Sequence, residues 1–261
     1  MSRISPSQAR DLLVAGGITG THRSHPRSGN IQKIHAMLAD DDEALFGLSG
    51  VRSYTAGEIL GFVAELTGCP PDIADLECDD AIAPARTVAA IVSAAERLTK
   101  EVQRQSNLLV LTGHPTGLLE HHMRVVDAYR RAGGSVVRPH ENERLPLTRK
   151  GRHLRIRYNG SVGCLSDGAN LLHTHSAEPM EALLAAVEAP DVVLADHGFA
   201  GAAVERGIPT LAVMDINDPA LAVAWAEGKD ITIIPMDDNR PPGLYEPSWR
   251  LFEQILSPET L

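Results

Sequence analysis

The chain of 261 residues is 43% hydrophobic and 22% charged, a composition that excludes a largely disordered, collagen-like or disulfide-scaffold protein. Its formal net charge of −10 at pH 7 offers no basic surface to a nucleic acid or an anionic membrane, so we expect neither as a partner. Eleven histidines against 4% aromatic residues point to site chemistry, because imidazole is the commonest metal ligand and titrates near neutral pH.

The first 106 residues have a helical pattern, because apolar residues recur at intervals of three and four and strand-like runs are missing. Thr55 and Glu58 have the spacing of a capping box, and Gly16-Gly17 follows an apolar stripe as a stop signal. The expected helices span residues 5–15, 30–39, 55–66 and 87–103.

From Asn107 onward, short runs rich in Val, Ile and Leu alternate with helical segments, which is typical of β-α units with a mostly parallel sheet. Asn159-Gly160 predicts a type I′ turn in a β-hairpin inserted at residues 153–165. The expected strands span residues 108–111, 135–138, 171–174, 192–195, 210–214 and 231–235. The expected helices span residues 118–132, 179–187, 200–206 and 219–227.

These elements predict an α/β fold with a Rossmann-like, mostly parallel sheet flanked by helices. We expect a helical N-terminal portion, residues 1–106, to pack on an α/β domain, residues 107–261, that carries the site. No Pro-, Gly- or Ser-rich linker separates them, so residues 1–261 as a single domain stay an open alternative.

Cysteine usage and hydropathy bear on the compartment. Cys69, Cys78 and Cys164 have no Cys-x-x-Cys spacing, so neither a disulfide framework nor a thiolate zinc site is expected. No secretory signal is visible at the start, and no apolar run approaches the roughly 18 residues of a membrane helix. We therefore expect a cytoplasmic protein with no membrane partner; a homo-oligomer is left open.

In an open parallel sheet, ligands bind outside the carboxyl ends of the strands, so the residues that follow each expected strand are the candidates for a site. In this chain they are unusually polar. They are Thr112–Gly117, His173–Ser176, Asp196–Gly198, Asp215–Asp218 and Asp237–Asn239. Several strand ends thus deliver His, Asp and Asn side chains to one rim of the sheet.

His173 and His175 form a His-x-His pair, whose alternation on a strand places both rings on one side, within reach of one ion. Packing and helix capping are the alternatives, and Asp196 and Asp218 in particular precede expected helices. Carboxylate and amide oxygens beside them suit Mg²⁺, Mn²⁺ or Zn²⁺. The predicted ligands of a divalent metal are His173, His175, Asp196, Asp215, Asn217 and Asp218.

Two segments are assigned to the substrate or its phosphate, and the basic stretch at residues 138–157 is a further anion-binding candidate unless it is a solvated face. The turn that carries Thr112, Gly113, Thr116 and Gly117 joins a strand to a helix and would present free N–H groups, unless it is a plain β-α turn. The adjacent carboxylates of Asp237 and Asp238 would repel each other unless a cation or proton lay between them; with Asn239 they are assigned to the substrate, and a solvent-exposed turn is the alternative. The basic, loop-like segment 21–27 is a candidate lid.

Four sequence segments resemble a family of mostly actinobacterial phosphatases: LVLTGHPTGLL, LLHTHSAEPME, VVLADHGFAGAAVERGIPTLAVMDINDPALAVAWAEG and IIPMDDNRPPGLYEP. The resemblance spans about residues 107–247 and is weaker in the N-terminal helices. It implies phosphatase activity and leaves the substrate and the catalytic residues open.

Hydrolysis of a phosphomonoester needs cations that offset the negative charge on the phosphoryl oxygens, an activated water, and an acid that protonates the leaving group. We expect a metal-dependent phosphatase acting on a small phosphorylated metabolite through metal-activated water, with His114, His197 and Asp215 as catalytic residues. The main alternative is a metal-free, Rossmann-like module that binds or isomerises a sugar phosphate or binds a nucleotide. A metal-dependent amidohydrolase fits less well, because the few lysines lie away from the strand ends.

Overall fold

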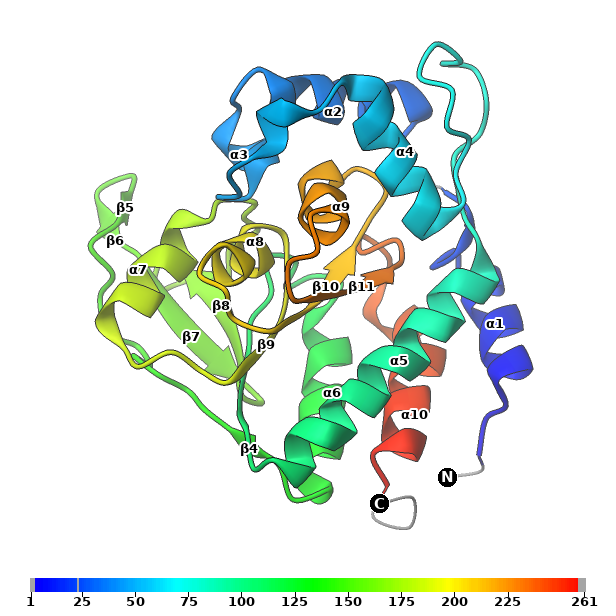
Figure 1. The fold of residues 1–261 in the computed structure, drawn as a ribbon. Coiled ribbons are helices and arrows are strands. Elements are labelled where there is room, and N and C mark those ends of the chain that lie inside the picture. The colour runs from blue at the N-terminus through cyan, green and yellow to red at the C-terminus, as the bar shows by residue number, and fades with distance from the viewer. Residues whose placement is uncertain (1–2, 23, 258–261) are drawn as a thin grey trace.

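The computed structural model describes residues 3–22 and 24–257 and contains a five-stranded parallel sheet (Figure 1). Its strands are β3 (Asn107–Val110), β4 (Ser135–Val136), β9 (Val192–Asp196), β10 (Thr210–Met214) and β11 (Ile231–Pro235), in the spatial order β11-β10-β9-β3-β4. Every neighbouring pair is parallel. The α/β fold class with a mostly parallel sheet is confirmed.

The strand order reverses once, between β3 and β9, because chain order runs outward from β3 in both directions. In doubly wound sheets this switch point leaves a crevice at the carboxyl ends of the two strands, where ligands bind. The topology therefore places the candidate site beside Thr112 and Asp196, the residues at the ends of β3 and β9.

Helices cover both faces of the sheet, because strand side chains alternate between two apolar cores. Leu108 and Val110 enter the first core, whereas Leu109 and Leu111 enter the second. The first core lies under α1 (Pro6–Ala15), α5 (Pro84–Gln103), α6 (Leu119–Arg131) and α10 (Glu246–Ile255). The second lies under α8 (His197–Glu205) and α9 (Pro219–Ala226), with α4 (Ala56–Thr67) and α7 (Glu178–Ala186) packed beside them.

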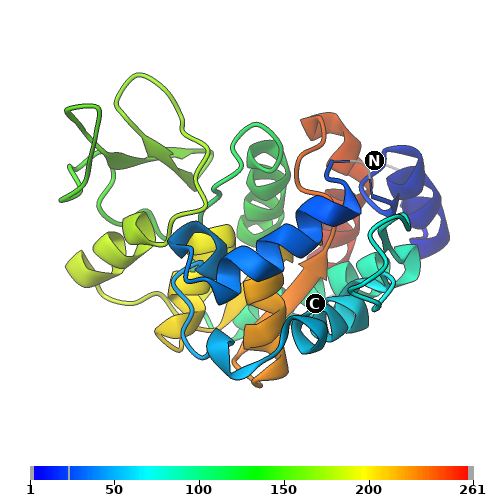
Figure 2. The same ribbon diagram turned by 90° about the horizontal axis from the view of Figure 1, so that it is seen from above.

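The N-terminal elements lie over the carboxyl ends of the strands, as the two views show (Figures 1 and 2). They are α2 (Arg27–Leu38), the short helix α3 (Asp42–Leu45) and the 3₁₀ helix η1 (Val51–Ser53); β1 (Gly20–Thr21) pairs with β2 (Ala81–Ile82) nearby. Each core takes residues from before and after residue 106. We infer that the helical portion and the α/β portion form one folding unit.

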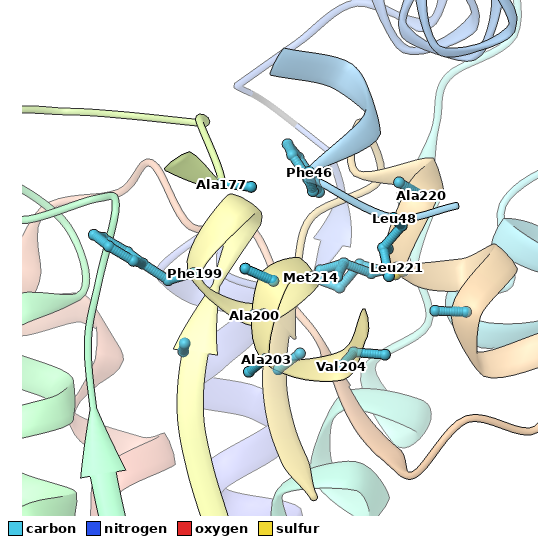
Figure 3. Close-up of a cluster of buried hydrophobic side chains, with 14 of the residues drawn as sticks. Phe46, Leu48, Ala177, Phe199, Ala200, Ala203, Val204, Met214, Ala220 and Leu221 are labelled. Atoms are coloured by element: carbon cyan, nitrogen blue, oxygen red, sulfur yellow. The ribbon is translucent and has the colours of Figure 1, made fainter. Parts of the chain in front are cut away.

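Helix α8 packs tightly against the N-terminal portion (Figure 3). A Cβ on Gly201 would lie 2.1 Å from the carbonyl oxygen of Phe46, so only glycine allows this approach of backbone to helix. Helix α8 begins at His197, three residues earlier than expected, and its first turn includes Gly198, where a Cβ would lie 2.4 Å from the carbonyl oxygen of His175. His197 consequently lies at the start of the helix and at the end of β9.

The strand expected at residues 171–174 is wrong. Only Leu171 forms a bridge, to Ser166, and the N–H groups that follow donate outside the sheet, from Leu172 to Leu165 O and from Thr174 to Gly113 O. The segment with His173 and His175 therefore crosses the end of β3 as irregular chain. Helix α10 and the 3₁₀ helices η1 and η2 (Pro242–Tyr245) were not expected from the sequence.

The inserted hairpin is confirmed as β7 (Arg155–Asn159) and β8 (Val162–Ser166). Its turn is centred one residue later than expected, on Gly160 and Ser161, whose φ angles of 53° and 66° are those of a type I′ turn. Gly163 bridges to Leu111, and its carbonyl accepts the N–H of Thr112 at 2.9 Å, so the hairpin extends the end of β3. A small second hairpin pairs β5 (Thr148–Arg149) with β6 (Arg152–His153).

Among the helices of residues 3–22 and 24–257, none is long and apolar enough to cross a membrane. Cys69, Cys78 and Cys164, all of them described, are free thiols, so the expectation of no disulfide among them is confirmed.

Candidate active site

A cavity of about 550 Å³ lies where the strand ends meet α2. The strand ends and the crossing segment contribute His114, His173, His175, Asn217 and Asn239; the N-terminal portion contributes His25, Gly29, Asn30, Gln32, Lys33 and Ala36. The cavity therefore brings together side chains from the ends of β3, β10 and β11 and from the crossing segment, and α2 covers them.

Three histidines of the strand ends and the crossing segment line this cavity, and the buried His197 packs against them. The Nδ1 atoms of His114 and His197 are 3.1 Å apart, and the ring of His175 stacks on that of His197 with centroids 4.3 Å apart. His173 lies edge-on to His114 at a centroid distance of 4.0 Å. Burial, followed by the nearby His197, lowers the pKa of both His114 and His175 to about 3, so both rings are neutral at pH 7, the form that binds metals.

His197 lies among three buried carboxylates. Its Nε2 is 3.2 Å from Asp238 Oδ2 and 3.4 Å from Asp218 Oδ1, and its Nδ1 is 3.0 Å from Asp196 Oδ1. Burial acts to lower the pKa of His197, but the charge of Asp218, the hydrogen bond to Asp196 and the close carboxylate of Asp238 outweigh it and raise that pKa well above its usual value. The backbone of His197 has a φ of 44°, a strained conformation that costs about 1–3 kcal/mol and is held by surrounding structure.

The carboxylates at the ends of β10 and β11 are crowded and almost fully buried. Asp215 and Asp218 are 0% exposed, and Asp237 and Asp238 are 1% exposed. Burial, with the charges of Asp238, Asp237 and Asp218, raises the pKa of Asp215 well above its usual value. Burial also raises the pKa of Asp238 to about 7. Without a cation, these side chains cannot all be ionised at neutral pH.

Several buried polar atoms of this region have no hydrogen-bond partner among the described residues. They are His22 Nδ1, Asp215 Oδ2, Asn217 Oδ1, Asp218 Oδ1 and Asp238 Oδ2. An unsatisfied buried donor or acceptor costs about 1–3 kcal/mol, and native proteins rarely leave such groups unpaired. These unpaired atoms lie close together, and all are nitrogens or oxygens of the kind that bind divalent metals. The group therefore fits a cation site.

The turn after β3 holds a carboxylate instead of presenting open N–H groups. Gly113 N–H donates to Asp196 Oδ1 at 2.7 Å, the Thr112 hydroxyl donates to Asp196 Oδ2, and Gly117 N–H donates to His114 O. A Cβ on Gly113 or Gly117 would lie 2.3 Å from a backbone oxygen, so these glycines serve close packing. Together with the exposure of Thr116, this does not support the predicted phosphate cradle.

His22 is the main site residue that sequence reasoning missed. Its side chain is fully buried, and its Nδ1 lies 3.4 Å from Asp215 Oδ1 and 3.6 Å from Asp237 Oδ2. The expected lid segment 21–27 was the available signal, although Arg23 within it lies outside the described residues. The Ser24 hydroxyl donates to Asp237 at 2.6 Å, so this segment joins the floor of the site rather than only covering it.

Comparison with known proteins identifies the family of this chain. A family model described as Phosphatase matches residues 4–256, and Phosphatase SCO2771 of Streptomyces coelicolor is 35% identical over 252 residues, which cover 93% of this chain and 94% of that protein. The chain belongs to this phosphatase family. The resemblance noted over residues 107–247 is thus confirmed, and the match extends through the N-terminal helices. No solved structure matches the chain.

The phosphatase chain also buries a histidine pair behind the site, on α6. His121 and His122 are 0% exposed, their Nδ1 atoms are 3.0 Å apart, and His121 Nε2 is 2.8 Å from the Ser248 hydroxyl. Burial lowers the pKa of His122 to about 4 and that of His121 well below its usual value. Both rings are therefore neutral in the folded protein at pH 7.

This pair predicts that the metal-free phosphatase loses stability as the pH falls from 6.5 towards 4. The folded pKa lies below the unfolded value of 6.5, so the unfolded chain binds more protons in this window and acid favours it. For His122 alone the loss is about 3 kcal/mol. Urea unfolding at pH 4 and pH 7 measures it. His122→Gln should reduce the pH slope by about one proton, whereas His35→Gln, on the exposed side of α2, should not; equal slopes in both variants would contradict the prediction.

Proposed function

We propose that this protein is a metal-dependent phosphatase that hydrolyses a small phosphomonoester. The observation that carries the proposal is the convergence of unpaired, buried nitrogen and oxygen donors at the point where the strand order reverses. Buried charges of this density are stable only when they are paired or coordinate a metal. The family supports the hydrolysis of phosphate esters, and the donor set supports the need for a cation.

The cation would be held by three histidines, of which His197 would give up its extra proton when the metal binds. The ligand atoms of His114, His175 and His197 lie within 4.8 Å of one another, and Asp218 lies beside His197. Imidazole nitrogen with carboxylate oxygen suits Zn²⁺ or Mn²⁺. When bound, the metal supplies positive charge against the phosphoryl oxygens and activates water for attack.

Asp196 acts as a positioning residue in this proposal rather than as a metal ligand. Both of its oxygens already accept hydrogen bonds, from Thr112 and Gly113, and its Oδ1 also faces Nδ1 of His197. These contacts fix the imidazole of His197 in place, which is the usual role of a carboxylate behind a metal-binding histidine.

Lys33 and His173 supply the remaining functions. Lys33 lies on α2 and lines both cavities beside the histidines, so its ammonium group would bind a phosphoryl oxygen. His173 also lines the cavity and lies outside the three-histidine group, which suits it to move a proton to the leaving group. We expected proton transfer from His114 and His197. In this proposal His173 has that role, because the first two would hold the cation.

The space available indicates a small substrate. The cavity over the histidines has about 550 Å³, and a second cavity of about 540 Å³ shares Lys33, His173 and His175 with it. The second cavity is also lined by Leu147, Thr148, Arg149, Leu154 and Leu165. The phosphoryl group would lie in the first cavity and the rest of a small phosphorylated metabolite in the second.

Metal removal tests the proposal. Purified protein treated with a chelator should release no phosphate from p-nitrophenyl phosphate or from a panel of phosphorylated metabolites, and one of Mg²⁺, Mn²⁺, Co²⁺ or Zn²⁺ should restore the release. The alternative, a metal-free module that binds a sugar phosphate or nucleotide, would bind its ligand in the presence of chelator and release no phosphate under any condition. Full phosphatase activity in the metal-free protein would contradict the metal requirement.

A further inference from the structure

A second group of donor atoms lies beside the three histidines. Ligand atoms of Asp215, Asp237 and Asp238 lie within 4.8 Å of one another, and these residues follow the neighbouring strands β10 and β11. Asp215 Oδ2 and Asp238 Oδ2 are buried without a hydrogen-bond partner among the described residues. A cation at the histidines can offset the charge of Asp238, which lies 3.2 Å from His197, but it leaves Asp215 and Asp237 without a cation between them.

His22 is an independent observation at the same place. Its imidazole comes from the N-terminal portion, is fully buried, and directs an unpaired Nδ1 between Asp215 and Asp237. Its Nε2 accepts the N–H of His25 at 3.2 Å, which places the proton of the neutral ring on Nδ1, facing the two carboxylates. A donor in this position orients carboxylates that bind a cation.

Asp238 belongs to both groups. Its Oδ2 lies 3.2 Å from His197 Nε2 and 3.7 Å from His114 Nδ1, and the same side chain completes the group of Asp215 and Asp237. A carboxylate has two oxygens and about four lone-pair sites, so one side chain can bind two ions.

We propose that the site holds a second divalent cation of the oxygen-preferring class, such as Mg²⁺ or Mn²⁺, bound by Asp215, Asp237 and Asp238. Asp238 is shared with the cation at the histidines, and His22 is a positioning residue. The inference rests on the metal-dependent function proposed above and adds a second metal to it. Paired cations suit phosphate-ester hydrolysis, because they stabilise charge on both the attacking and the leaving oxygen.

Metal stoichiometry tests the second cation. Chelator-treated protein is titrated with Mn²⁺ by calorimetry, and bound metal is measured by plasma mass spectrometry. The wild type should bind about two equivalents, and Asp237→Asn should bind about one. His22→Ala should weaken the second equivalent by about 10- to 100-fold without removing a ligand. Asp127→Asn, at an exposed position of α6, is the matched control and should keep both equivalents.

Electron paramagnetic resonance gives a second readout, which the wild type alone can provide and one variant can check. Two Mn²⁺ ions that share Asp238 should be spin-coupled in the wild type, and Asp237→Asn should show only the signal of an isolated ion. Circular dichroism melting checks that each variant folds. One equivalent of Mn²⁺ in the wild type, with an isolated-ion signal, would overturn the second cation and leave the proposed function standing. Binding of no metal at all would overturn both.

Discussion

Replacing His175 by alanine is expected to lower phosphate release by about three orders of magnitude while the protein stays folded. His175 stacks on His197, with centroids 4.3 Å apart, and lines the open cavity. Its loss removes one of three nitrogen donors to the proposed cation, whose charge stabilisation is worth several kcal/mol in the transition state, and each 1.36 kcal/mol is about a factor of ten in rate. Partial exposure of the side chain keeps the cost in stability small.

The measurement is steady-state phosphate release at saturating metal, compared with His35→Ala, an exposed histidine on α2 that should have wild-type activity. Because His175 borders a cavity of about 550 Å³, added imidazole has room to enter the space left by the side chain. Partial recovery with imidazole would identify the ring nitrogen as the missing group. Unchanged kcat in His175→Ala would contradict the place of this histidine in the cation site.

The sheet was predictable from sequence because its strands are buried on both faces. Strands β10 and β11 occupy the expected residues 210–214 and 231–235, since continuous apolar runs bounded by turns suit only fully buried strands or short helices. The run at Leu171-Leu172 has the same local pattern and is not a strand. The N–H of Leu172 donates to Leu165 O, and the N–H of Thr174 donates to Gly113 O. The pairing with Gly113, which is distant in the chain, leaves no trace in the local sequence.

The part of the site that could be predicted from the sequence consists of the residues that follow the strands. The structure brings His114, His173, His175 and His197 into one cluster with the expected aspartates, although their roles as ligands or catalysts stay proposals. His22 could not be placed, because it lies nearly 200 residues before Asp215 along the chain and meets it only through the pairing of the N-terminal portion with the sheet. The sequence predicts phosphate binding at the Thr112–Gly117 turn, whereas in the structure its glycines serve close packing. Composition does not distinguish these two uses of glycine.

Substituting Gly198 by alanine is expected to reduce both stability and activity strongly. A Cβ at this first-turn position of α8 would lie 2.3 Å from the carbonyl carbon of Ser176 and 2.4 Å from the carbonyl oxygen of His175. These are backbone atoms, so the crossing segment itself must shift. Overpacking of this kind costs about 1–3 kcal/mol in unfolding free energy. A displacement of His175 by about 1 Å also costs about 100-fold in rate.

Gly61→Ala is the matched control, because Gly61 lies inside α4 and a Cβ there would meet no atom within 4 Å. That variant should be more stable by about 0.5–1 kcal/mol, since alanine loses less conformational entropy in a helix, and its activity should equal the wild type. Urea unfolding and phosphate release separate the two effects: Gly198→Ala should lower both quantities, and metal titration should show weakened binding, because the displaced segment carries His175 away from His197. A Gly198→Ala protein with wild-type stability and metal affinity would mean that the crossing segment does not depend on this close approach.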